Sequence, residues 1–134
     1  MRAFVPALAA LAACAPALHI AATVTEVAAE ASLACDAVTT DEIIGSKWHG
    51  LTVYETEGGG VLGEFPSTAR IAEYFGGIGM ALAGFNATFV VRYGQHTEAQ
   101  RIVADAWRIA ANLVIVGVEV DAIRNNAEYG GRCY

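Results

Sequence analysis

Charged residues are scarce in this chain, since Asp, Glu, Lys and Arg together make up only 16% of its 134 residues. Apolar residues reach 55%, which is enough to bury a core and argues against an intrinsically disordered chain. The eight basic residues are scattered and outnumbered by fourteen acidic ones. This balance argues against a nucleic-acid-binding protein and against direct attraction to anionic lipid, because both need clustered Lys and Arg. The length fits a single domain.

The first eighteen residues have one basic residue, Arg2, followed by an uncharged run rich in Ala and Leu. A short basic region before an apolar region is the arrangement of a secretory signal. Residues 11–14 (LAAC) resemble the lipobox of bacterial lipoproteins, in which the cysteine is acylated and becomes the first residue after cleavage. The resemblance implies a lipoprotein signal peptide at residues 1–13, a lipid on Cys14 and an anchored protein of the cell envelope that faces the periplasm or the exterior.

Two alternatives to lipidation stay open. The signal is cleaved in the ordinary way near Ala21 or Ala22, which gives a secreted protein, or the segment is retained as a buried helix.

Three cysteines are an odd number for an exported protein, so we expect one of them to have a separate use. With a lipid on Cys14, the other two cysteines are Cys35 and Cys133, which flank the presumed folded region. A disulfide between them closes a loop of about 100 residues, worth roughly 4 kcal/mol in the chain-entropy model. The alternative is that both are unpaired thiols.

Residues 14–39 show no clean helical or strand period and are expected to be a tether, which places the folded domain at residues 40–134. Residues 51–54 (LTVY) favour a strand, which the glycines at 58–60 interrupt before Val61 and Leu62. Pro66 and Ser67 mark the start of a helix that the glycines at 76, 77 and 79 weaken at its end. Residues 85–93 (FNATFVVRY) favour a second strand.

The strongest helical pattern runs from Thr97 to about Ala111. Thr97 and Gln100 have the spacing of a capping box, and Asn112 suits the left-handed position that ends a helix. The continuous apolar run at residues 113–118 (LVIVGV) then predicts a strand covered on both faces. The helix is expected to bury its apolar face against this strand, with its charged residues pointing elsewhere. That face consists of Ile102, Val103, Ala106 and Ile109, and the charged residues are Glu98, Arg101, Asp105 and Arg108.

Residues 106–121 (AWRIAANLVIVGVEVD) resemble the helix-to-strand segment that ends proteins of the YbjQ-like family, the putative heavy-metal-binding domains. Residues 60–64 (GVLGE) and 74–78 (YFGGI) are similar to that family's upstream strand end and helix, in the same order. The resemblance implies an α+β fold, with a small antiparallel sheet packed on two helices. It also implies a homo-oligomer, a ring of five subunits, with a structural or binding role for a ligand that the sequence does not identify.

The family label invites a search for a metal site, and the candidate ligands are the three cysteines with His19, His49 and His96. They show no metal-ligand spacing, so we expect no metal or other cofactor. A periplasmic heavy-metal-binding module, with a site assembled across the fold or between subunits, stays as an alternative function.

An enzyme is not expected, because Ser46 and Ser67 lie in no nucleophile motif and no catalytic residue is assigned. An enzyme with an unrecognised site stays as an alternative. Ser67 is interpreted as a helix cap, and the acids Glu55, Glu57 and Glu64 as a solvated strand edge. Trp48 and Trp107 are interpreted as core or interface anchors.

Residues 74–91 contain no charged residue over eighteen positions, just enough to span a membrane. Because glycines dilute this run, a buried core segment is the favoured interpretation and a second membrane element is the alternative.

Overall fold

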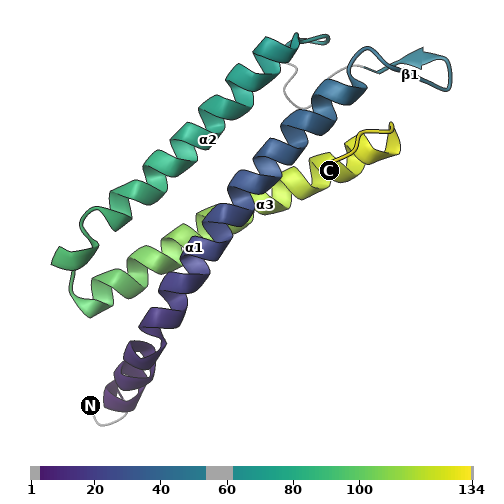
Figure 1. The fold of residues 1–134 in the computed structure, drawn as a ribbon. Coiled ribbons are helices and arrows are strands. Elements are labelled where there is room, and N and C mark those ends of the chain that lie inside the picture. The colour runs from purple at the N-terminus through teal and green to yellow at the C-terminus, as the bar shows by residue number, and fades with distance from the viewer. Residues whose placement is uncertain (1–3, 54–61, 134) are drawn as a thin grey trace.

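The computed structural model of the chain describes residues 4–53 and 62–133, and for residues 4–14 it describes the backbone alone. Three long helices dominate the fold (Figure 1): α1 (Phe4–Ile43), α2 (Thr68–Val90) and α3 (Glu98–Glu128). A single 3₁₀ turn, η1 (Tyr93–Gln95), precedes α3. The expected α+β fold class is wrong, because the sheet within the described ranges consists of two strands of two residues each.

The two strands, β1 (Lys47–Trp48) and β2 (Leu51–Thr52), form an antiparallel hairpin with Trp48 paired to Leu51. His49 and Gly50 between them both have positive φ, at 49° and 84°. This is the backbone that a two-residue hairpin turn needs, and a glycine adopts it without strain. The strand expected at 51–54 is therefore confirmed only at Leu51 and Thr52. Tyr54 to Val61 lie outside the described residues.

The helix starts predicted from the sequence are confirmed. Ser67 is the N-cap of α2 and accepts a hydrogen bond from the backbone N–H of Arg70. Thr97 caps α3 with both hydrogen bonds of the capping box to Gln100. Each of these contacts spans three residues, so the local sequence is sufficient to specify it.

The helix ends predicted from the sequence are wrong. Helix α2 runs through its glycines to Val90 and includes most of the strand expected at 85–93. Helix α3 continues past Asn112 through the strand expected at 113–118 and ends at Glu128. The segment expected to be a tether, residues 14–39, belongs to helix α1. Tertiary contacts decide these cases, because a Val-rich run has only a weak intrinsic preference for a strand.

The largest interface of the bundle lies between α1 and α3. The two helices run parallel, since His19 is close to Asp105 and Asp36 is close to Asn126. The residues of α3 that face the interior recur at alternating spacings of three and four, the repeat of helices that pack along a shallow crossing angle. These residues are Asp105, Arg108, Asn112, Ile115, Glu119, Ala122 and Asn126.

Helix α2 runs against α1 and α3 in the opposite direction and completes the core (Figure 1). The buried apolar cluster joins α1 and α2 and consists of Ala29, Leu33, Ile71, Phe75 and Leu82. We name the two ends of the bundle by their connections. The hairpin end carries the β-hairpin, the start of α2 and the C-terminus, and the turn end carries η1 and the start of α3 (Figure 1).

Candidate functional site

A buried arginine joins all three helices in the interior of the bundle. The guanidinium of Arg108 on α3 is 2% exposed and donates from Nη2 to Oε2 of Glu26 on α1 at 2.7 Å. Its Nη1 donates to Oδ1 of Asp105 at 3.1 Å, and its Nε donates to Oδ1 of Asn86 on α2 at 3.2 Å. A buried charge is stable only when it is paired and hydrogen-bonded, and Arg108 meets both conditions.

Two buried side-chain amides continue this polar interior. Asn86 and Asn112 are both fully buried. Nδ2 of Asn86 donates to Oδ1 of Asn112 at 3.0 Å, and Nδ2 of Asn112 lies 3.3 Å from Oδ1 of Asn86. Asn112 is thus a core residue of α3 and not the end of a helix, because its amide is held by a partner on α2. We call these five side chains the Arg108 cluster: Glu26, Asn86, Asp105, Arg108 and Asn112.

The cluster extends to the turn end through Asp105. Oδ2 of Asp105 accepts a hydrogen bond from the Tyr93 hydroxyl at 2.8 Å, and Oδ1 lies 3.3 Å from Nδ1 of His19. The rings of His19 and Tyr93 are in contact, with their centroids 4.5 Å apart and their planes tilted by 38°. Burial raises the pKa of the Tyr93 hydroxyl, and the hydrogen bond and negative charge of Asp105 raise it further. Tyr93 therefore stays protonated at neutral pH and serves as the donor.

The prediction of which face of α3 is buried is wrong. Val103 is 56% exposed and Ala106 is exposed, while Ile102 and Ile109 are half-buried. Asp105 and Arg108, expected to point away from the core, are each only 1% exposed. The polar residues of α3 recur at helical spacing just as its apolar ones do. A prediction that uses hydrophobicity alone therefore buries the wrong face of the helix. The sequence does carry a signal for this face: Asp105, Arg108 and Asn112 lie on one side of the helix and are the only charged or amide residues between Ile102 and Val118.

A cavity of about 490 Å³ lies at the hairpin end. Apolar and aromatic side chains from all three helices and the hairpin line it, including Ile43, Trp48, Tyr74, Phe75 and Tyr129. The rings of Trp48 and Tyr129 meet edge to face with their centroids 5.2 Å apart. The volume falls in the range of cavities that hold small organic ligands.

Polar groups enter the same cavity from α1 and α3. Asp36 and Glu119 both line it and are 5% and 7% exposed. Oδ1 of Asp36 accepts a hydrogen bond from Nδ2 of Asn126 at 2.8 Å, and the same nitrogen lies within 3.1 Å of the hydroxyls of Thr39 and Thr40. None of these residues was a candidate from the sequence: Asp36 and Thr39 lay in the expected tether, Thr40 at the start of the expected domain, and Glu119 and Asn126 after the expected final strand.

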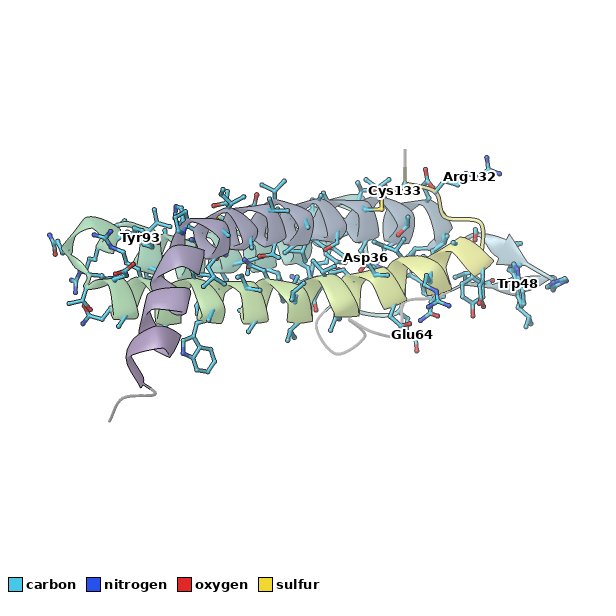
Figure 2. All side chains as sticks on the ribbon, turned by 90° about the horizontal axis from the view of Figure 1, so that it is seen from below. Asp36, Trp48, Glu64, Tyr93, Arg132 and Cys133 are labelled. Carbon is cyan, nitrogen blue, oxygen red and sulfur yellow. A yellow bond between two sulfur atoms is a disulfide. The ribbon has the colours of Figure 1, made fainter. Side chains whose placement is uncertain are left out.

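Cys35 on α1 and Cys133 near the C-terminus are brought together as a disulfide, with their Cα atoms 5.4 Å apart (Figure 2). That separation lies within the usual range for disulfides. The preceding Gly131 approaches α1 so closely that a Cβ there would lie 3.1 Å from Thr39 and Ile43. Cys14 is in α1, but its side chain, and with it the predicted lipidation, lies outside the described residues.

The candidate metal ligands do not converge. His49 lies in the hairpin turn, edge-on to Trp48, and His96 follows η1, far along the bundle from the hairpin. Among the side chains that the structure describes, those of residues 15–53 and 62–133, no group of three or more His, Cys, Asp or Glu could hold a metal ion.

The remaining candidates are spread over the molecule. Ser67 is the cap described above, and Ser46 precedes the hairpin. Glu55 and Glu57 lie outside the described residues, and Glu64 is exposed. Trp48 lines the cavity, whereas Trp107 is 62% exposed on α3.

The fold and the site define a small three-helix bundle with a charged interior. Comparisons with protein-family models, curated proteins and solved structures find no match to the chain. The α+β fold that the YbjQ-like resemblance implies is not the one observed. The residues of the resemblance at 74–78 and 106–121 lie within helices α2 and α3.

Proposed function

We propose that this is a protein of the cell envelope with a binding role, whose ligand is a small molecule with an apolar body and a cationic amine. The cavity at the hairpin end carries the proposal. Its volume of about 490 Å³ suits such a molecule. Its walls combine flat aromatic surface with a few polar groups, which is the composition expected of a ligand site.

The amine follows from the charge of the polar groups. Asp36 and Glu119 line the cavity and, as carboxylates, accept hydrogen bonds without donating them. Trp48, Tyr74 and Tyr129 supply aromatic faces that attract a cation. A ligand that carries an anionic group would meet two carboxylates of the same sign, so the cavity favours amines over acids.

The envelope location is proposed from the N-terminal segment and the cysteines. Residues 1–14 resemble a lipoprotein signal, and export reaches an oxidising compartment where the disulfide between Cys35 and Cys133 is stable. The lipid on Cys14 remains a prediction.

Ligand binding raises the temperature at which the bundle unfolds, because the ligand binds the folded state alone. The test uses three naphthalene derivatives that differ in one group: 2-naphthylmethylamine, 2-naphthylmethanol and 2-naphthoate. Unfolding of the full chain is followed by circular dichroism at 222 nm as each is titrated. We expect a saturable stabilisation by the amine, a smaller one by the alcohol and none by the carboxylate.

Matched variants link the effect to the cavity. Glu119→Gln should reduce the preference for the amine over the alcohol, and Trp48→Ala should weaken binding of both. Trp107→Phe changes the other tryptophan, which is exposed elsewhere on α3, and should leave binding unchanged. Equal stabilisation by the amine and the carboxylate, or an unchanged response in Trp48→Ala, would count against this site.

A further inference from the structure

Much of the interior of the bundle is polar, and many of its large apolar side chains are exposed. Its five largest fully buried side chains, Asn86, Asp105, Arg108, Asn112 and Thr39, are all polar. Soluble proteins show the reverse preference, with charged residues almost never fully buried. The arrangement therefore calls for an apolar surrounding medium.

Large apolar side chains are exposed on the outer faces of all three helices. On α2, Met80 is 75% exposed, and on α3 Val114 is 64% exposed. We call these exposed residues the apolar belt: Ile20, Val24 and Val27 on α1, Met80, Phe85, Val90 and Val91 on α2, and Val103, Trp107, Leu113, Val114, Val118 and Val120 on α3. Soluble monomers usually expose such residues singly or in one limited patch, whereas here they lie on all three helices.

Charged side chains are absent from most of the surface that the belt covers. Residues 74–91 of the sequence contain none. Between Ile102 and Val120 on α3 the charged residues are Asp105, Arg108 and Glu119, and all three are buried. On α1, the exposed Glu30 lies beside Gly76 and Gly79, close to where the belt ends on α2. Polar groups inside a membrane protein are placed in this way, turned inward and paired with one another.

On α3 the belt has nearly the height of a lipid bilayer. From Val103 to Val120 it spans roughly 26 Å at the rise of an α-helix, close to the thickness of the hydrocarbon core, about 30 Å. On α2 the uncharged stretch is residues 74–91. Arg70 and Glu73 lie beyond this stretch at the hairpin end, and Arg92 lies beyond it at the turn end. The segment Thr68–Gln95 is also long and apolar enough to cross a membrane by length and composition, with 11% of its most apolar window buried.

We propose that the three-helix bundle is embedded in a lipid bilayer, with the apolar belt in contact with the acyl chains. The occupant of this surface is lipid and not a second copy of the chain, because one contact between copies covers one face. The belt, by contrast, continues over the outer faces of α1, α2 and α3. The inference does not depend on the cavity or its ligand.

The test is site-directed spin labelling of the full chain in vesicles of phosphatidylethanolamine and phosphatidylglycerol. Single cysteines are introduced in a Cys14→Ser background that keeps the disulfide: Val27→Cys, Met80→Cys and Val114→Cys in the belt, with Gln95→Cys and Arg124→Cys at the two ends. Relaxation of each label is measured with oxygen, which concentrates in acyl chains, and with a water-soluble nickel chelate. We expect oxygen to dominate at the three belt positions and the nickel chelate to dominate at the two ends.

Each other outcome overturns the proposal. Access of the nickel chelate to the belt labels would show that the helices stand in water, as in a soluble domain held only by an N-terminal anchor. Protection of the belt labels from both reagents would show that protein, such as a second copy, covers them. All five substitutions are at exposed positions, so they leave the interior of the bundle unchanged.

Discussion

Nη2 of Arg108 on α3 lies 2.7 Å from Oε2 of Glu26 on α1, although 82 residues separate the two in the sequence. The arginine is almost completely buried and the glutamate is about three-quarters buried. Because Arg108 also contacts Asn86 on α2, one side chain holds the relative positions of all three helices. This contact accounts for a charged residue in the interior of a chain that has few charges.

Replacing Arg108 with methionine should lower the free energy of unfolding by about 3–5 kcal/mol, because Glu26 and Asp105 then stay buried without their cationic partner. Chemical denaturation in mild detergent, followed by circular dichroism, measures the loss. The control is Arg124→Ala, which removes an exposed arginine from the same helix and should change stability by well under about 1 kcal/mol. Similar losses in the two variants would show that the Arg108 contacts contribute little.

The amide pair of Asn86 and Asn112 gives a second prediction. Asn86→Ala should cost about 1–3 kcal/mol, since it removes the donor to the buried Oδ1 of Asn112 and the acceptor of Arg108 Nε. Thr88→Ala, two residues along α2 at an exposed position, is the matched control and should have little effect. If the double variant Asn86→Ala with Asn112→Ala loses the sum of the two single losses, the pair is not coupled.

The disulfide between Cys35 and Cys133 should make the bundle sensitive to reducing agents. It closes a loop with a sequence separation of 98 residues, for which the chain-entropy model gives about 4–5 kcal/mol. A lower unfolding temperature is therefore expected in reductant. The variant Cys35→Ser with Cys133→Ser should unfold at this lower temperature with or without reductant. Alkylation of both cysteines in the unreduced, denatured chain would show that the bond does not form.

The two ends of a membrane-embedded bundle should face different compartments. Because a disulfide persists in an oxidising environment, the hairpin end, which Cys133 ties to α1, is expected outside the cytoplasm. A maleimide that does not cross membranes should label Arg124→Cys in intact cells and label Gln95→Cys only after the cells are opened. This orientation puts Cys14, which precedes His19 on α1 at the turn end, on the cytoplasmic side, whereas the predicted lipid needs Cys14 outside the cytoplasm. The expected labelling pattern would therefore count against lipidation of Cys14, and the opposite pattern would reverse the orientation.

Lipidation remains a prediction from the LAAC sequence at residues 11–14. Cys14→Ser should abolish the incorporation of labelled palmitate and leave an unprocessed precursor, because only a thiol at this position accepts the diacylglycerol. Cys35→Ser changes a cysteine outside this motif and should incorporate palmitate normally. Normal processing of Cys14→Ser would remove the lipoprotein interpretation.

The sequence by itself determined the starts of α2 and α3, because the caps at Ser67 and Thr97 are hydrogen bonds between residues three positions apart. The sequence also shows that residues 74–91 carry no charge, but it does not show whether protein or lipid surrounds them. Only the tertiary structure decided that α3 continues through Asn112 and turns Asp105 and Arg108 inward. The helical repeat of α3 is consistent with burial of its apolar face and equally with burial of the face that carries Asp105 and Arg108. The choice between them depends on partners such as Glu26 and Asn86, which are distant in the sequence and become neighbours only when the three helices pack.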